Sequence, residues 1–432
     1  MSVLSRVAAP PATDDVAGVI AALLTNLEGA PAPELSLAAE AESAVPQSDS
    51  SLLSGMVACA VPRRLLGPVG LGAASLLVEP PGGDRASPAA PAPAARESPA
   101  AATGSAIPPL YCPPPVRDDP ALAEAVNAGI ISWAQAIGLY EGRLDELHRA
   151  DFGRLIMLAH PDCDDPDRLV AAAKCSVSFW AVDDYYCEED ADDHAPDGSP
   201  SSAEAELGPR LELVMAAVDP VHLPDRYQVQ LERALDADPI LRAFRTSFDH
   251  LAHYATPAQL ARLRTEVGGW FIALGAEAGW RAAGRMPPVW EYLANRQPHS
   301  FLPCMAPIDV VGGYELGAAD YTDPAVRRVV TTAALASQMV NDLYSMARED
   351  LSGGREFNLP TVLAAEENCS RREAVGRTAV VHDELVHRFE REATVLAATA
   401  SPQLRRFLAG LWAWMGGNRA WHADSRRYRE TE

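Results

Sequence analysis

An acidic run in the middle of the chain, Asp183-Asp184-Tyr185-Tyr186-Cys187-Glu188, contains residue types that bind divalent metal ions. Asp184 and Glu188 are spaced i,i+4, so on an α-helix they share a face, where like charges destabilise the helix. The dipole also disfavours carboxylates at a helix C-terminus. Oxygen ligands crowded in this way suit Mg²⁺. We predict that Asp183, Asp184 and Glu188 bind a metal; the alternative is a solvated acidic helix end.

The segment before this run predicts the helix that positions it. Asp165 is a suitable N-cap and Pro166 suits the first helical position. The apolar residues Val177–Val182 then lead directly into the carboxylates. Phe179 and Trp180 therefore stand one turn before the acidic run.

A second polar cluster is Asn341-Asp342-Leu343-Tyr344-Ser345-Met346-Ala347-Arg348-Glu349. Asn341, Ser345 and Glu349 are spaced i, i+4, i+8, so an amide oxygen, a hydroxyl and a carboxylate line one stripe of a helix. We predict that these three residues are further metal ligands, with Arg348 as a neighbouring cation. The alternative is an ordinary polar helix face, because this spacing also occurs by chance.

Helix-start signals recur along the chain and predict an all-α domain. Five cap-and-proline pairs each open an apolar-periodic stretch: Asp119-Pro120, Asp165-Pro166, Thr256-Pro257, Asp323-Pro324 and Ser401-Pro402. A capping box at Ser370 and a stretch from Leu144 to Leu158, closed by Pro161, predict two more helices. Because sustained two-residue alternation is lacking, we expect one helical bundle with a central cavity.

The first 110 residues differ in composition from the rest of the chain. They contain no Phe, Trp or Tyr, but hold more than a third of the 36 prolines. Such a segment buries too little apolar surface to offset its ordering entropy. We therefore predict a disordered Pro/Ala-rich extension over residues 1–110 and a folded domain over residues 111–432.

Charge and cysteine content restrict the partners and the compartment. The net charge of −23 argues against nucleic acid and anionic membranes as partners. A polyanionic small substrate would need metal ions and a few placed arginines. The seven cysteines are scattered and form no C-x-x-C pair, which predicts a reduced, cytoplasmic protein without a zinc site.

Taken together, the motifs resemble those of bacterial class I terpene synthases. The run Asp183–Glu188 corresponds to the aspartate-rich motif of that family, and Asn341–Glu349 corresponds to its N-D-x-x-S-x-x-x-E motif. Arg296 stands 45 residues before Asn341, about where the family keeps a diphosphate-sensing arginine. Arg427-Tyr428 matches the terminal Arg-Tyr pair of the family. The resemblance covers residues 111–432.

The resemblance implies a helical bundle whose central cavity ionises an allylic diphosphate. Two metal motifs would hold three Mg²⁺ ions with the diphosphate, and four residues would bind its oxygens: Arg296, Arg348, Arg427 and Tyr428. Phe179 and Trp180 would stabilise the carbocation through their aromatic faces. Other aromatic residues are more often plain core, and we assign no role to Trp133, Trp270, Trp280, Tyr314 or Trp412.

The resemblance extends further to members of the family that act on 2-methylgeranyl diphosphate. The long Pro/Ala-rich extension, the entry segment Leu110–Arg117 and the block Ala172–Cys175 carry it. It implies that a separate S-adenosylmethionine-dependent methyltransferase supplies the 2-methyl group, since this chain has no Gly-rich nucleotide loop. It also leaves a homodimer open.

Three alternatives remain at this point. A cyclase acting on geranyl or farnesyl diphosphate would have the same motifs, and pocket volume would decide between them. A chain-elongating prenyltransferase would need a second Asp-rich motif, and a helical scaffold with acidic faces would release no diphosphate. The chain departs from the commoner family pattern after Arg296, where Gln297-Pro298-His299-Ser300 replaces an acidic-then-glycine pair.

Overall fold

The computed structural model describes residues 107–187, 194–195, 198–219, 221–351 and 357–428. For residues 347–351 and 428 it describes the backbone only. All of these residues belong to one of the two units into which the chain divides. The predicted extension over residues 1–110 thus lies outside the described residues, apart from residues 107–110.

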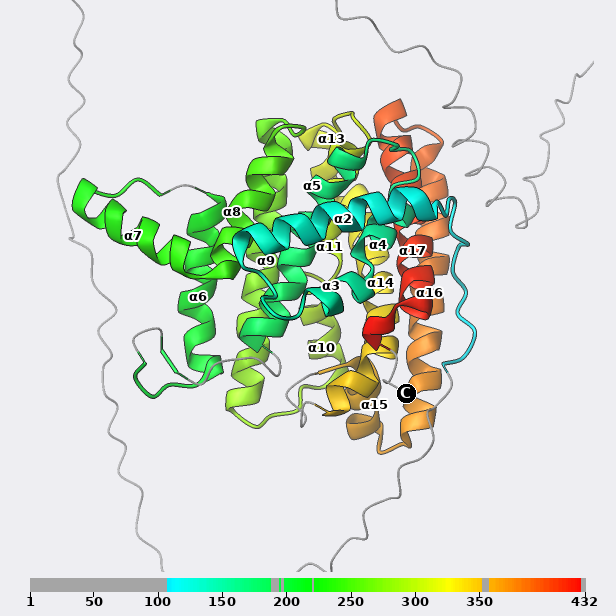
Figure 1. The fold of residues 1–432 in the computed structure, drawn as a ribbon. Helices are drawn as coiled ribbons and strands as arrows, with labels where there is room; N and C mark the ends of the chain where they lie inside the picture. The colour runs from blue at the N-terminus through cyan, green and yellow to red at the C-terminus, as the bar shows by residue number, and fades with distance from the viewer. Residues whose placement is uncertain (1–106, 188–193, 196–197, 220, 352–356, 429–432) are drawn as a thin grey trace, which may run out of the picture. The chain divides into compact units, whose positions relative to one another are not determined.

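Within these ranges the chain forms helices and no strand, as the sequence predicts (Figure 1). The α-helices are α2 (Pro120–Ile137), α3 (Leu144–Ala150), α4 (Phe152–Ala159), α5 (Pro166–Val182), α6 (Ala203–Val218), α7 (Asp225–Ala237), α8 (Pro239–Ala252), α9 (Pro257–Ala282), α10 (Val289–Arg296), α11 (Leu302–Met305), α12 (Ile308–Val311), α13 (Ala318–Thr322), α14 (Pro324–Leu351), α15 (Leu359–Glu367), α16 (Arg371–Ala397) and α17 (Pro402–Asp424). A π-helix, η2 (Asp183–Cys187), continues α5, and a 3₁₀ turn, η3 (Arg426–Tyr428), follows α17.

The predicted caps are confirmed. The Asp119 side chain accepts hydrogen bonds from two backbone amides of the first turn of α2, and Asp165 does the same for α5. Thr256 and Ser370 form complete capping boxes at α9 and α16, and Ser401 caps α17. Local side-chain chemistry therefore fixes where these helices begin.

One predicted helix is wrong in its extent. The stretch from Leu144 to Leu158 forms two helices, α3 and α4, because Asp151 adopts a left-handed conformation with φ 58°. Aspartate tolerates this conformation better than most residues. Its carboxylate then accepts a hydrogen bond from the Arg154 backbone amide and caps α4. The same residue thus ends one helix and begins the next.

Two long helices form the centres of the packing. Helix α5 packs against α2, α4 and α8, and α14 packs against α15, α16 and α17. Helix α17 joins the two groups because it also packs against α4 (Figure 1). This arrangement places the two polar motifs, one at the end of α5 and one on α14, inside the same bundle.

Two further observations bear on the environment of the chain. No helix in the described part of the chain combines the length and the apolar character needed to cross a bilayer. The six cysteines of that part, among them Cys175, Cys187 and Cys304, form no disulfide.

The close approach of α4 to α2 yields a stability prediction. A Cβ atom added at Gly153 would lie 2.4 Å from the carbonyl oxygen of Ala123 and 2.6 Å from the backbone nitrogen of Asn127. Backbone atoms cannot move aside cheaply, so Gly153→Ala should lower the free energy of unfolding by about 2 kcal/mol despite the higher helix propensity of alanine. Chemical denaturation would measure the change.

Gly376 on α16 is the matched control, because an added Cβ there meets no atom within 4 Å. Gly376→Ala should stabilise the protein by up to about 1 kcal/mol through helix propensity. If both substitutions proved stabilising, α2 and α4 would have to lie further apart than described here.

Candidate active site

The acidic motif forms the π-helix η2, which the sequence analysis did not predict. A π-helix bonds i to i+5 and is often found at functional sites. Asp183 and Cys187 line a cavity, while Asp184 is 4% exposed and buried beside Tyr140 and Arg427. Asp184 therefore lies in a π-helix and not in the α-helix that the sequence analysis assumed. Glu188 lies outside the described residues.

Asp184 connects the end of α5 to the C-terminal segment. Its Oδ2 accepts a hydrogen bond from the Tyr140 hydroxyl at 2.6 Å, and its Oδ1 lies 2.7 Å from Nη2 of Arg427. Nη1 of Arg427 donates to Oδ2 at 3.3 Å, which makes the ion pair two-pronged. Burial and the Asp184 charge raise the pKa of Tyr140 well above its usual value, so Tyr140 stays a neutral donor. Arg427 is thereby held at the acidic motif.

The second motif lies on α14 as predicted. Asn341 and Ser345 both line the cavity, and the Ser345 hydroxyl donates to the Asn341 carbonyl oxygen at 2.8 Å. The side chains of Arg348, Glu349 and Tyr428 fall outside the described part of the chain. For these three residues the assignments remain predictions.

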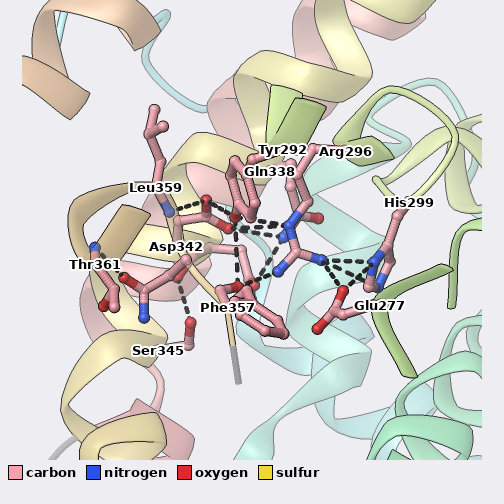
Figure 2. A network of polar contacts seen from close by, with 12 residues as sticks. Glu277, Tyr292, Arg296, His299, Gln338, Asp342, Ser345, Phe357, Leu359 and Thr361 are labelled. Atoms are coloured by element: carbon pink, nitrogen blue, oxygen red, sulfur yellow. Dashed lines mark hydrogen bonds and ion pairs between the residues drawn. The ribbon is translucent and has the colours of Figure 1, made fainter. Parts of the chain in front are cut away.

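Asp342 follows the predicted ligand Asn341 but is not among the residues that line the cavity. It is buried and accepts three hydrogen bonds, from the Tyr292 hydroxyl (2.5 Å), the Leu359 amide (2.9 Å) and Nε2 of Gln338 (3.1 Å). These bonds join α14 to α10 and α15 (Figure 2). Asp342 therefore anchors the helix that carries the motif.

Arg296 lines the cavity at the end of α10 and is only 4% exposed. Its Nε donates to the Tyr292 hydroxyl at 2.7 Å, and its Nη2 donates to the Phe357 carbonyl oxygen. Its Nη1 lies 3.4 Å from Glu277 Oε2 and 2.6 Å from His299 Nδ1 (Figure 2). Burial alone would lower the pKa of Arg296, but Tyr292 and Glu277 raise it well above its usual value, so the group stays charged.

Glu277 on α9 supplies the negative charge of this cluster and was not predicted. It is 1% exposed, and its carboxylate contacts Arg281 (3.2 Å), Arg296 and His299 (3.0 Å). Burial by itself would raise the pKa of Glu277, but the charge of Arg296 and the hydrogen bond from His299 lower it to about 2. Burial and Arg296 together lower the pKa of His299. Glu277 is thus the ionised partner of the cationic groups around it.

The cavity brings most of the predicted residues together. The space between its walls, including the part that is open to solvent, amounts to about 830 Å³. Seven residues named from the sequence line it: Phe179, Trp180, Asp183, Arg296, Asn341, Ser345 and Arg427. Ten further lining residues were given no role from the sequence: Cys187, Trp270, Leu274, Glu277, His299, Ser300, Phe301, Pro303, Cys304 and Gln338.

Aromatic side chains form the apolar wall of the cavity. Phe179 packs edge-on against Trp270, with ring centroids 5.5 Å apart, and Trp180 packs edge-on against Phe301 at 5.6 Å. Trp421 of α17 supports Trp180 from behind the lining at 5.9 Å. The other aromatic candidates are not among the lining residues; Trp133, Trp280 and Trp412 are buried in the core.

The donor set suits a magnesium ion. Asp183 offers a carboxylate, Asn341 an amide oxygen and Ser345 a hydroxyl to the same cavity. These are hard oxygen donors that leave room for water and substrate ligands, which Mg²⁺ prefers. No group of three or more His, Cys, Asp or Glu in metal-binding proximity occurs among the described residues. A group of that kind counts neither the Asn341 amide nor the Ser345 hydroxyl as a donor. Two of the predicted carboxylate ligands, Glu188 and Glu349, lie outside the part of the chain whose side chains are described.

Comparison with known proteins gives a consistent result. Residues 174–388 match the family described as "Terpene synthase family 2, C-terminal metal binding". The chain is 40% identical over 323 residues to 2-methylisoborneol synthase of Saccharopolyspora erythraea, and the aligned region covers 74% of this chain and 89% of the relative. It is 40% identical over 372 residues to 2-methylisoborneol synthase of Streptomyces ambofaciens, covering 85% of this chain and 80% of the relative.

Solved structures agree with the sequence relatives. The crystal structure of 2-methylisoborneol synthase from Streptomyces coelicolor in complex with Mg²⁺ and 2-fluoroneryl diphosphate superposes with a TM-score of 0.68 at 38% identity. The match covers 76% of this chain and 99% of that one. The complex of the same enzyme with Mg²⁺ and geranyl-S-thiolodiphosphate gives a TM-score of 0.68 at 37% identity, with the same coverage.

The pKa of Glu277 yields a pH prediction. Its folded-state pKa of about 2 lies below the usual value of 4.5, so the stabilisation it provides is complete above about pH 4.5 and is lost as the pH falls towards 2. Glu277→Gln should lower the free energy of unfolding by about 3 kcal/mol at neutral pH, because it leaves buried cations uncompensated. The difference from the native chain should narrow below about pH 4.5.

Urea unfolding of both proteins between about pH 7 and about pH 3 would measure this. Glu291→Gln is the control, because Glu291 pairs with Arg285 near the surface, where the two side chains are 28% and 45% exposed and ion pairs contribute little. Glutamine also keeps an acceptor for the Trp280 indole. An equally large loss from Glu291→Gln, or a pH-independent difference for Glu277→Gln, would contradict the assignment.

Proposed function

The chain belongs to the class I terpene synthase family, and we propose that it catalyses the Mg²⁺-dependent cyclisation of 2-methylgeranyl diphosphate to 2-methylisoborneol. One observation carries the proposal: oxygen ligands, two arginines and an aromatic wall line a single cavity. Concave sites with an apolar wall and a few convergent polar groups are the usual binding sites of small molecules. The names and bound ligands of the relatives support the choice of substrate.

We assign metal binding to Asp183, Asn341 and Ser345, and with them to Asp184, Glu188 and Glu349. Mg²⁺ held there would neutralise charge that develops on the diphosphate as its bond to carbon breaks. The chain would hold three ions with the diphosphate. The Asp184 carboxylate already pairs with Arg427, so a metal ion bound by Asp184 would share this carboxylate with the arginine.

Arg296 and Arg427 would bind the oxygens of the departing diphosphate, together with Arg348 and Tyr428. Both described arginines line the cavity and already have carboxylate partners, Glu277 for Arg296 and Asp184 for Arg427. These partners fix the guanidinium groups before substrate arrives. Preorganised charge of this kind stabilises a transition state without further rearrangement.

Phe179 and Trp180 would face the carbocation once diphosphate has left, together with Trp270 and Phe301. Aromatic faces attract a cation by about 0.5–2 kcal/mol each and offer no nucleophile. The cation would rearrange through a 2-methyl-linalyl stage, close to a bornyl-type ring system and be captured by water. Loss of one proton from that water leaves the alcohol, so substrate and water give 2-methylisoborneol and diphosphate.

The proposal includes two features outside the cavity. Residues 111–432 would form the catalytic domain, and a separate S-adenosylmethionine-dependent methyltransferase would supply the 2-methyl group. The free thiols of the described part fit a cytoplasmic protein.

Incubation of the full chain with Mg²⁺ and, separately, 2-methylgeranyl, geranyl and farnesyl diphosphates tests the function. Gas chromatography–mass spectrometry should detect a methylated C11 alcohol formed preferentially from the 2-methyl substrate. A chelator should abolish diphosphate release, because the leaving group would lose its counter-charge. A terpene formed only from geranyl or farnesyl diphosphate would overturn the substrate, and no diphosphate release from any of the three would overturn the enzyme.

The aromatic wall yields a separate prediction. Phe179→Leu keeps an apolar side chain but removes the aromatic face, so kcat should fall by about tenfold, which corresponds to a cation–π interaction of about 1.4 kcal/mol. Binding of inorganic diphosphate with Mg²⁺ should not change. Trp412→Phe is the control, since Trp412 stacks on Phe389 and does not line the cavity. Equal losses from both substitutions would indicate a packing effect.

A further inference from the structure

A chain of hydrogen bonds passes through the side chain of Asn341, one of the residues assigned above to metal binding. Nε2 of Gln338 lies 3.1 Å from Oδ1 of Asp342 and 3.1 Å from Oδ1 of Asn341. Nδ2 of Asn341 lies 3.2 Å from Nε2 of His422, whose Nδ1 lies 2.9 Å from the Asn418 carbonyl oxygen. The chain runs from α14 to α17.

The direction of the first bonds follows from Asp342. Its carboxylate accepts hydrogen bonds from the Tyr292 hydroxyl and the Leu359 amide, so its bond to Gln338 also requires a donor (Figure 2). Gln338 must therefore turn its NH₂ group towards Asp342. The second hydrogen of that group then points at Asn341, and the atom of Asn341 that receives it must be the oxygen.

The direction of the last bonds follows independently from His422. The Asn418 carbonyl oxygen can only accept, so Nδ1 of His422 carries a hydrogen. The ring is 1% exposed and packs against Phe301 and Trp421, an environment that disfavours the charged form. In the neutral ring Nε2 is an acceptor, so the Asn341 atom that faces it must be the NH₂ group.

The hydrogen bonds from Gln338 and to His422 thus require the same orientation of the Asn341 amide. The two orientations of an asparagine amide exchange its oxygen and its NH₂ group. Gln338, which faces the oxygen of Asn341, lines the cavity, whereas His422, which faces the NH₂ group, is not among the lining residues. An oxygen has two lone pairs, so the bond from Gln338 is compatible with metal coordination.

Resting on the proposed function, we infer that Gln338 and His422 are positioning residues that hold the Asn341 amide oxygen ready for Mg²⁺. Neither residue belongs to the two metal motifs. Groups that orient a metal ligand in this way commonly change metal affinity by 10–100-fold when removed.

The test measures binding of inorganic diphosphate to the full chain at fixed Mg²⁺ by isothermal titration calorimetry. His422→Asn keeps a donor near the Nδ1 position but removes the acceptor that faces Asn341, so binding should weaken by about tenfold or more. His422→Gln places a side-chain oxygen near the Nε2 position and should retain most of the affinity. The two variants are both uncharged and both remove the ring.

An Asn341→Asp background separates positioning from packing. A carboxylate offers oxygen in either orientation and needs no partner to turn it, so His422→Asn should cause no further loss of affinity there. Gln338→Met provides a second route to the same result and should behave like His422→Asn in both backgrounds, whether or not His422→Asn folds. Thermal unfolding of the metal-free variants checks folding.

Three results would overturn the inference. Unchanged diphosphate binding in His422→Asn and Gln338→Met would show that these hydrogen bonds do not orient the Asn341 amide for metal binding. Equal weakening in the native and Asn341→Asp backgrounds would show a packing effect, with the proposed function intact. A native chain that binds no diphosphate with Mg²⁺ would instead refute the proposed function, and this inference with it.

Discussion

The pairing of buried charge is the constraint on which this structure depends. The chain carries a net charge of −23, yet its cavity presents two arginines, Arg296 and Arg427. A charge removed from water is costly unless a partner compensates it. Each arginine therefore has a buried carboxylate, Glu277 or Asp184. The first pair joins the neighbouring helices α9 and α10, and the second joins the end of α5 to the C-terminal segment. The ion pairs that compensate the buried charge of Arg296 and Arg427 also hold both guanidinium groups at the cavity.

This constraint explains which parts of the structure could be predicted. Caps and motif spacings depend on neighbouring residues, so the starts of α2, α5, α9, α14, α16 and α17 follow from the sequence. The break at Asp151 and the π-helix at Asp183–Cys187 do not, because both are local departures from the regular helix that the apolar pattern does not record. A signal existed for α8, where Asp238-Pro239 repeats the cap-and-proline pair found elsewhere.

The candidate site divides in the same way. Asp183 and Asn341 were predicted because they belong to short motifs, and Phe179 because it precedes one by a helical turn; all three line one cavity. Glu277 and His422 were missed because each acts through a partner on another helix, and no spacing along the chain marks such a pair. Sequence patterns thus identify groups that line the cavity more readily than the groups that hold them in place.

The segment after Arg296 shows that the charge of this arginine is balanced from another helix. The commoner pattern of the family that this chain resembles has an acidic residue followed by glycine in this region, whereas this chain has Gln297-Pro298-His299-Ser300. A histidine at that position could not balance the charge of Arg296. Glu277 does so from α9, and it contacts His299 as well. Because the carboxylate comes from a neighbouring helix, the charge balance at the cavity does not depend on an acidic residue in the segment that follows Arg296.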